Sequence, residues 1–548
     1  MVKSNYHRRL FHFPLCTYEF LRGGSPSRIR RTRRISLGTT TLPRSSILLT
    51  IPVAFMLCSS INVGTPIICI GGNIMHGFPS NSVRNSVYFS PHIHLESCFQ
   101  LWYTILLDTM HKIYRQEGFM LFKNITVLND NFEIEKGRFV LVKDGRIASI
   151  EDASPEDYSG EVYDGKGKLL MPGFYNAHAH SPMTLMRGYG ENLALQDWLN
   201  KRIFPFEDKL SSPSVYWGTL LAMAESIRFG IVSSSDMYYF IDDMVRAVAD
   251  SGAKANISRA ISNFDNNDVW NLPSVQEMQR TYEAYHNTED ERIKMDMSIH
   301  AEYTSNETGV RAVADYAREK QANMHVHVSE TRLEHEECKA RHGGMTPVQY
   351  FNSLGAFDTR TTAAHCVWVE GEDFDILKEK GVTVASNPVS NLKLASGVCN
   401  VPELLRRGIR VAIGTDSVAS NNSLNFFEEM KMFAIASKMY YQDPTAVTPV
   451  ETLRAATVNG ALSQGRGDCG RISEGCRADL IVVDIDQPNM QPVHNMANNL
   501  VYSASGSDIV LTMVDGRVLY RDGEYMTIDI EKTMFEVQKE TDAILHAL

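Results

Sequence analysis

Eight short runs with strand character recur between residues 169 and 416, and helical segments separate them. This regular alternation of strand and helix signals limits the chain to folds built from parallel strands with helical crossovers. The runs are LLMPGFYNAHAH, IVSSSDMY, KANISRAI, MDMSIHAEY, MHVHVSE, TTAAHCVW, VTVASNP and RVAIGTD.

The segments between these runs carry helix start and stop signals. In SSPSVYWGTLLAMAESIRFG, Ser212 is the expected N-cap, Pro213 stands at the first helical position and Gly230 ends the helix. TSNETGVRAVADYAREKQ likewise begins at a Ser/Asn cap, with Glu307 in the first turn. Both segments are therefore predicted as helices.

Eight strand–helix units over about 300 residues predict a (β/α)8 barrel, which carries its chemistry at the C-terminal ends of the strands. An open doubly wound sheet is the competing architecture. The sequence has neither a G-x-G-x-x-G motif nor a P-loop, the phosphate-binding motifs that usually accompany such a sheet. The barrel, predicted for residues 171–467, is the favoured interpretation.

Two β-rich segments with Asp-Gly turns flank the predicted barrel. FKNITVLN and RFVLVKDGRIASI precede it, and ADLIVVDID and IVLTMVDGRVLYRDGEYM follow it. Since both flanks have the same character, we expect residues 119–170 and 468–548 to pair into one small β-sandwich domain.

Residues 1–118 form a leader of a different character. Residues 1–110 contain 11 Lys/Arg and 3 Asp/Glu, whereas the whole chain has a net charge of -11. The apolar stretch 46–72 follows the basic run RIRRTRR, but Pro52 and Pro66 interrupt it. We expect this leader not to belong to the working protein, with translation starting at Met110 or Met120. A membrane tether and a disordered extension are the alternatives.

Charge and cysteine content restrict the partners and the compartment. The acidic net charge argues against nucleic acid as the main partner. None of the nine cysteines forms a C-x-x-C pair, which predicts reduced thiols and a cytoplasmic protein. We expect no membrane association of the body that follows the leader.

Side chains capable of chemistry stand at the ends of the predicted strands. His178 and His180 are one residue apart and would project from the same face of an extended strand. The other strand-end groups are His300, His325, His327, Glu330, His365 and Asp416. Because the strand ends of a barrel meet on one face, these groups predict a metal-dependent active site.

The donor types fit a borderline divalent cation such as zinc. The expected ligands are His178, His180, Asp416 and one histidine of the fifth strand. His327 is preferred to His325, which lies deeper in that strand. No lysine is placed to carry a bridging carbamate, so we expect one metal ion per subunit, with Fe²⁺ or Mn²⁺ as alternatives to Zn²⁺.

Residues 119–548 resemble the amidohydrolase superfamily, and within it the 5-methylthioadenosine/S-adenosylhomocysteine deaminases, which are close to the triazine hydrolases. The motifs that carry the resemblance are MPGFYNAHAHSPMTLMRG, LQDWLNKRIFPFED, HVSET, AAHCVWV, SNPVSNLKLASG and GTDSVASNNSLNFFEEM. The resemblance implies a barrel with a β-sandwich and zinc on His178, His180, His327 and Asp416.

The resemblance also implies roles for individual residues. Glu330 would shuttle a proton to the purine ring, His365 would orient the attacking water, and Asp416 would take up its proton. The implied substrate contacts are Glu207, on the ribose hydroxyls, and Trp198, Arg259, His300, Glu330 and Asp416. The sequence departs from the family at Ile299 and Glu302, which replace two prolines, and a second arginine after Arg259 is not apparent.

The expected function is hydrolytic deamination of an adenosine-type nucleoside, such as 5′-methylthioadenosine, S-adenosylhomocysteine or adenosine, to the inosine analogue and ammonia. The alternatives are another amino- or chloro-substituted ring (guanine, cytosine or an s-triazine) and a non-catalytic barrel scaffold. We expect a homo-oligomer whose partner is the small-molecule substrate. A chain that starts at Met110 or Met120 is expected to be as active as the full chain.

Overall fold

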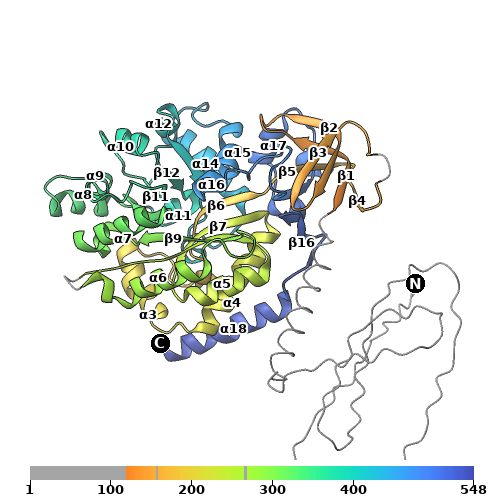
Figure 1. The fold of residues 1–548 in the computed structure, drawn as a ribbon. Coiled ribbons are helices and arrows are strands. Elements are labelled where there is room, and N and C mark those ends of the chain that lie inside the picture. The colour runs from red at the N-terminus through yellow and green to blue at the C-terminus, as the bar shows by residue number, and fades with distance from the viewer. Residues whose placement is uncertain (1–118, 156–157, 265–267) are drawn as a thin grey trace, which may run out of the picture. The chain divides into compact units, whose positions relative to one another are not determined.

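The computed structural model describes residues 119–155, 158–264 and 268–548 of the chain (Figure 1). The predicted leader lies outside the described residues.

Eight parallel strands form one sheet in chain order, and a bridge between Ala179 and Asp416 joins the first strand to the end of the last, which closes the barrel. The predicted (β/α)8 barrel is confirmed. Its strands are β6 (Phe174–Ala179), β7 (Ile231–Tyr238), β8 (Lys254–Arg259), β9 (Ile293–Ile299), β10 (Met324–Val328), β11 (Thr361–His365), β12 (Thr383–Ser386) and β13 (Arg410–Ile413).

The first predicted run is two strands rather than one. β5 (Lys168–Pro172) pairs in the flanking sheet, and β6 begins the barrel after Gly173. A Cβ atom at Gly173 would lie 2.3 Å from a side-chain carbon of Val232, so only glycine allows the chain to pass this close to β7. A continuous apolar run cannot reveal such a change of sheet, because both strands are buried.

Helices surround the barrel strands (Figure 1). They are α4 (Ser212–Arg228), α5 (Ile241–Ser251), α6 (Pro273–Tyr285), α7 (Glu307–Lys320), α8 (Arg332–Arg341), α9 (Pro347–Ser353), α10 (Asp373–Glu379), α11 (Pro388–Lys393), α12 (Val401–Arg406), α13 (Val418–Asn421), α14 (Phe426–Tyr441), α15 (Pro449–Ala456) and α16 (Val458–Ser463). Further along the chain are α17 (Met496–Tyr502) and α18 (Ile530–Ala547). No helix in the described part of the chain combines the length and apolar character needed to cross a membrane.

The start of α4 corrects the predicted cap. The N-cap is Ser211, one residue before Ser212, because Ser211 Oγ accepts a hydrogen bond from the backbone N–H of Ser214. The hydroxyl of Ser214 in turn accepts from the backbone N–H of Ser211, which completes a capping box. The consecutive serines of this segment made the choice ambiguous in the sequence.

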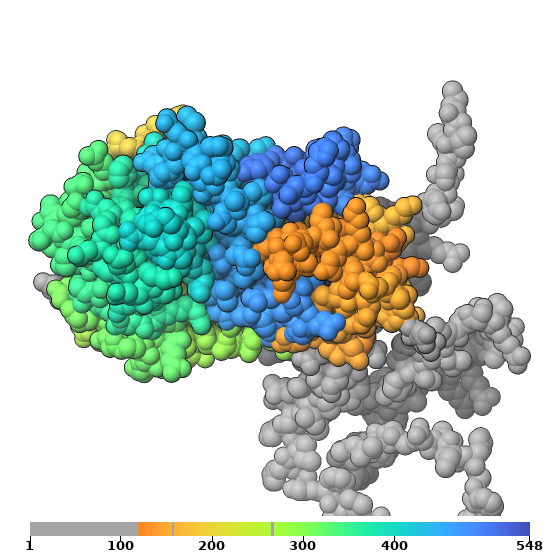
Figure 2. All heavy atoms as spheres, turned by 90° about the horizontal axis from the view of Figure 1, so that it is seen from above, coloured from red at the N-terminus to blue at the C-terminus, as the bar shows by residue number. Residues whose placement is uncertain are grey.

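The two flanks meet in one nine-stranded sheet of the described residues, in the order β17-β16-β15-β14-β5-β1-β2-β3, with β4 paired to β1. Figure 2 shows the N-terminal strands, in orange, beside the C-terminal segment, in blue. The bounds are β1 (Met120–Leu128), β2 (Ile134–Lys143), β3 (Arg146–Glu151), β4 (Glu161–Asp164), β14 (Leu480–Asp484), β15 (Ile509–Val514), β16 (Arg517–Arg521) and β17 (Glu524–Tyr525). A two-layer sandwich with boundaries at residues 170 and 468 stays a prediction.

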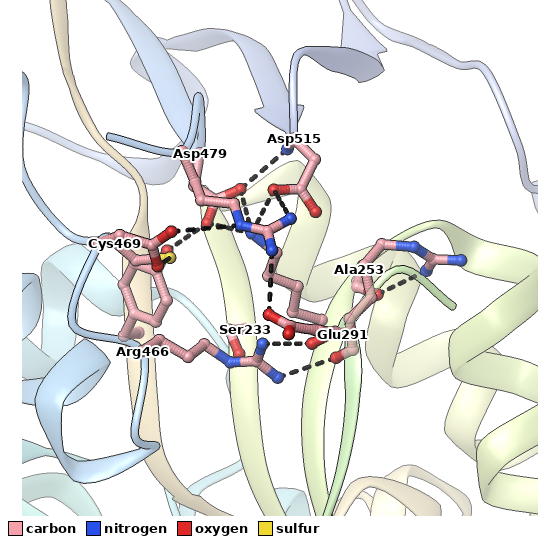
Figure 3. Close-up of polar contacts among 12 residues, drawn as sticks. Ser233, Ala253, Glu291, Arg466, Cys469, Asp479 and Asp515 are labelled. Carbon is pink, nitrogen blue, oxygen red and sulfur yellow. Dashed lines mark hydrogen bonds and ion pairs between the residues drawn. The ribbon is translucent and has the colours of Figure 1, made fainter. Parts of the chain in front are cut away.

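A buried ion-pair cluster joins this sheet to the N-terminal end of the barrel (Figure 3). Lys254, the first residue of β8, donates from Nζ to Asp479 Oδ1 and to Asp515 Oδ1, each at 2.7 Å. The hydroxyl of Tyr175 also donates to Asp479. Burial opposes the charge on Lys254, but the two carboxylates raise its pKa above the ordinary value.

Replacing Lys254 by methionine should lower the free energy of unfolding by about 3–5 kcal/mol, because the buried Asp479 loses its cation. Denaturant titration followed by circular dichroism measures the change. Lys539→Met is the matched control, since Lys539 pairs with Glu536 on the exposed side of α18 and its replacement should leave the free energy of unfolding nearly unchanged. Equal stability of the two variants would show that the buried cluster does not hold the sheet to the barrel.

Candidate active site

The predicted chemical groups lie together at the C-terminal ends of the barrel strands. Here the backbone takes left-handed conformations that are unfavourable for residues other than glycine, with φ of 49° at Ser329, 73° at His365 and 61° at Asp416. Such residues persist where the surrounding structure over-determines them, and they cluster at active sites. His365 is the last residue of β11, and Asp416 lies three residues after the end of β13.

Three histidines and one aspartate direct their donor atoms at one point. Asp416 Oδ1 lies 3.4 Å from His178 Nε2 and 3.3 Å from His180 Nε2. His327 Nε2 lies 3.3 Å from His180 Nε2. His178, His180 and Asp416 form one group with the spacing of metal ligands, and His178, His327 and His365 form another. The structure therefore brings together all four predicted ligands.

Hydrogen bonds at Nδ1 of His180 and His327 determine which nitrogen of each ring faces the predicted metal site. Nδ1 of His180 lies 2.6 Å from the carbonyl oxygen of Met237, and Nδ1 of His327 lies 2.5 Å from that of His300. Because a carbonyl oxygen only accepts, both Nδ1 atoms carry a proton, and Nε2 is the nitrogen of each ring that is placed to bind a metal. Hydrogen bonds of this kind commonly orient metal-binding histidines.

The donor set fits a divalent cation. His178 Nε2 is buried without a hydrogen-bond partner, and the Nε2 atoms of His180 and His327 face each other. Burial and the neighbouring imidazoles hold the pKa of His327 well below its ordinary value, so its ring is neutral, as a metal ligand requires. A cation at this point would bind the three imidazole nitrogens and the carboxylate of Asp416, which otherwise face one another.

The structure distinguishes the two histidines of β10. His325 Nε2 lies 2.9 Å from His178 Nδ1, on the side of that ring away from Asp416. His327 reaches the donor cluster directly through Nε2. His325 thus supports a predicted ligand, and His327 stands at the position expected of one.

Glu330 lies beside the donor cluster and is buried. Its Oε1 accepts a hydrogen bond from Ser396 Oγ at 3.1 Å, and its Oε2 lies 3.8 Å from His365 Nε2. Burial, together with the charge of Asp416, raises the pKa of Glu330 to about 8. The side chain is therefore protonated at neutral pH and able to donate.

Several supporting residues were not predicted. The side-chain amides of Asn387 and Asn391 lie 3.2 Å and 2.9 Å from His365 Nδ1, which leaves the proton of this ring on Nε2, toward Glu330. Ser390 Oγ donates to Asp416 Oδ2 at 2.6 Å. The i, i+4 spacing of the two asparagines in SNPVSNLKLASG is a signal that could have identified them, because it places Asn387, the N-cap of α11, about one turn from Asn391.

The predicted substrate-contact residues line one pocket, with one exception. The pocket residues are Trp198, Glu207, His300, Glu330, His365 and Asp416. Glu207 lies at the end of α3 (Phe204–Glu207), and burial raises its pKa to about 7. Arg259 lines an adjoining cavity, which it shares with Glu207.

A (β/α)8 barrel with three histidines and an aspartate converging at its C-terminal end, beside a buried glutamate, defines a metal-dependent hydrolase. The amidohydrolase family profile matches residues 169–519. The chain belongs to the amidohydrolase family, and the resemblance found in the sequence is confirmed.

Relatives of known name cover the body of the chain. The 5-methylthioadenosine/S-adenosylhomocysteine deaminase of Dictyoglomus thermophilum is 41% identical over 420 residues, which is 77% of this chain and 97% of the relative. The 5′-deoxyadenosine deaminase of Methanosarcina mazei is 39% identical over 433 residues, covering 78% of this chain and 98% of the relative.

Solved structures share the fold. An adenosine deaminase from Xanthomonas campestris with bound zinc superimposes with a TM-score of 0.73 at 30% identity, covering 78% of this chain and 98% of that one. A zinc complex of atrazine chlorohydrolase from Arthrobacter aurescens gives a TM-score of 0.72 at 22% identity, over 77% of this chain and 100% of that one, which shows the fold alone.

Proposed function

We propose that this chain is a metal-dependent hydrolytic deaminase of adenosine-type nucleosides, releasing ammonia and the inosine analogue. The observation that carries the proposal is a single pocket lined by three of the four metal-ligand residues, His180, His327 and Asp416, together with Glu330, whose pKa burial raises to about 8, and Glu207. The two relatives compared by sequence above are named as deaminases of adenosine derivatives, which supports the same reaction.

The residues that would hold the metal are His178, His180, His327 and Asp416. Nitrogen and carboxylate donors favour zinc, one ion per subunit, with Fe²⁺ or Mn²⁺ as alternatives. The zinc bound in the Xanthomonas campestris enzyme supports this choice. When bound, such an ion lowers the pKa of a water molecule enough to make it a nucleophile at neutral pH.

The protein groups then divide the proton transfers. Glu330 donates its proton to a ring nitrogen as water adds to the adjacent amino-bearing carbon of the purine. The Nε2–H of His365 orients the attacking water. Asp416 takes up one proton of that water and passes it to the departing amine, and the proton of the remaining hydroxyl returns to Glu330 as ammonia leaves and the carbonyl of the inosine product forms. Two carboxylates in different environments thus act as acid and base, a common arrangement in enzymes.

Glu207 supplies the preference for a nucleoside. Its carboxylate accepts hydrogen bonds from the two ribose hydroxyls, with Trp198 and His300 on neighbouring walls of the pocket. A free base lacks these hydroxyls and gains nothing from this side chain. The enzyme is expected to act in the cytoplasm as a homo-oligomer.

Glu207→Ala should lower kcat/KM for 5′-methylthioadenosine and adenosine at least tenfold, since each hydrogen bond to a charged acceptor contributes about 1.5–3 kcal/mol. Deamination of a substrate without ribose should change little. Ammonia release measures both. The matched control is Asp197→Ala, because Asp197 is an exposed carboxylate of the nearby α2 (Leu195–Trp198) that pairs with Lys201. An equal loss for both substrate types would remove the basis for the nucleoside assignment.

A further inference from the structure

A second cavity of about 530 Å³ adjoins the pocket, and we call it the annex. Glu207 lines both the pocket and the annex. Phe204 and Tyr239 also line both cavities, so in the pose that the proposed function requires, with the purine at the metal-ligand group and the ribose on Glu207, the annex is the adjoining space for a 5′ substituent. The lining of the annex therefore determines which 5′ substituents the enzyme accepts.

The charged groups that line the annex are Glu207, Asp208, Arg259 and Glu277. Arg259 is the one cation among the described residues that line the annex, and it already forms an ion pair. Arg259 donates from Nε to Glu277 Oε2 at 2.7 Å and from the guanidinium to the carbonyl oxygen of Ala260 at 2.6 Å. Among the described residues, neither Glu207 nor Asp208 takes part in an ion pair. The annex thus presents two carboxyl groups and no free cation.

The remaining lining is aromatic and held in place. Phe204 and Phe240 are 37% and 38% exposed, and the ring of Tyr239 lies 4.6 Å below the guanidinium of Arg259. Phe240 has φ of 55° and ψ of 55°, a left-handed conformation that is rare for a bulky side chain. Backbone strain of this kind is typical of ligand sites.

Glu277 connects these features. One carboxylate oxygen accepts from Arg259, and the other accepts the backbone N–H of Ile241 at 3.1 Å, directly after Phe240. Glu277, a residue of α6, therefore pairs with Arg259, the only cation among the described residues that line the annex, and also holds the backbone beside the aromatic side chains.

Resting on the deaminase function proposed above, we propose that the annex selects adenosines whose 5′ substituent is uncharged or cationic and rejects those with a 5′ carboxylate, so that this chain, unlike relatives named for S-adenosylhomocysteine, disfavours that substrate. An alkylthio group packs on the exposed phenylalanine rings, and an ammonium group pairs with Asp208. A carboxylate meets like charge and finds no free partner, and its desolvation is uncompensated.

Two substrates of matched length separate charge from size: 5′-deoxy-5′-(3-aminopropyl)thioadenosine and 5′-deoxy-5′-(2-carboxyethyl)thioadenosine. With the metal-loaded full chain, we expect kcat/KM for ammonia release to be at least tenfold higher for the amine than for the acid. The ratio should decrease as salt screens the annex charges. Equal values for the two substrates would overturn the inference and leave the deaminase function standing.

Glu277→Gln tests the mechanism of selection, because the amide keeps an acceptor for Ile241 while releasing Arg259. The amine-to-acid ratio should decrease at least fivefold, and Asp208→Asn should decrease it in the same direction. Glu283→Gln is the control, since Glu283 lies on the exposed face of the same helix and lines neither cavity. An unchanged ratio in Glu277→Gln and Asp208→Asn would overturn the inference. Failure of the wild type to deaminate any adenosine would instead overturn the proposed function.

Discussion

Replacing His178 by alanine is expected to abolish both metal binding and turnover. His178 is buried, its Nε2 has no other partner, and its ring contacts those of His180 and His327. Removing it deletes one of the four donors that would hold the ion. Elemental analysis of the purified variant measures the metal, and ammonia release measures the activity.

The control for this variant is His546→Ala, because His546 is exposed near the end of α18. It should keep the metal content and rate of the wild type. His180→Ala should repeat the result of His178→Ala, which guards against a local folding defect at one position. A His178→Ala variant with wild-type metal content would contradict the assigned ligand set.

Glu330→Gln is expected to keep the metal and lose activity by about two to four orders of magnitude, the range for removal of a general acid. The amide is nearly isosteric and retains an acceptor for Ser396, but it cannot release a proton to the purine ring. Metal analysis and single-turnover ammonia release on the same sample separate the two effects.

Glu336→Gln on the exposed side of α8 is the matched control, because it removes a carboxylate six residues away from Glu330 without touching the pocket. It should be as active as the wild type. Loss of metal in Glu330→Gln would mean that Glu330 is a ligand rather than a proton donor.

The barrel was predictable because each strand is a short apolar run and the chain places its polar groups where those runs end. His178, His180, His327 and Asp416 could be assigned for the same reason, since the ends of parallel strands in a barrel meet on one face. The choice of His327 over His325 followed from depth along β10, and the contact of His325 with the back of His178 agrees with it.

Contacts between distant segments were not predictable. Nothing near Arg259 in the sequence indicates that it forms an ion pair with Glu277, 18 residues later. Lys254 and Asp479 are 225 residues apart and meet only because the flanking sheet packs on the barrel. The split of the first run at Gly173 is also tertiary, since the neighbouring Val232 determines it. In each case the identity of the contacting residue depends on tertiary packing, which local sequence patterns do not indicate.

The most direct test of the account is ammonia release by the zinc-loaded chain across a panel of 5′-methylthioadenosine, 5′-deoxyadenosine, adenosine, adenine, guanine, cytosine and an amino-s-triazine. We expect the adenosine derivatives to have the highest kcat/KM, at least tenfold above adenine, and the product to be the matching inosine. A higher kcat/KM for guanine, cytosine or the triazine than for every adenosine derivative would contradict it.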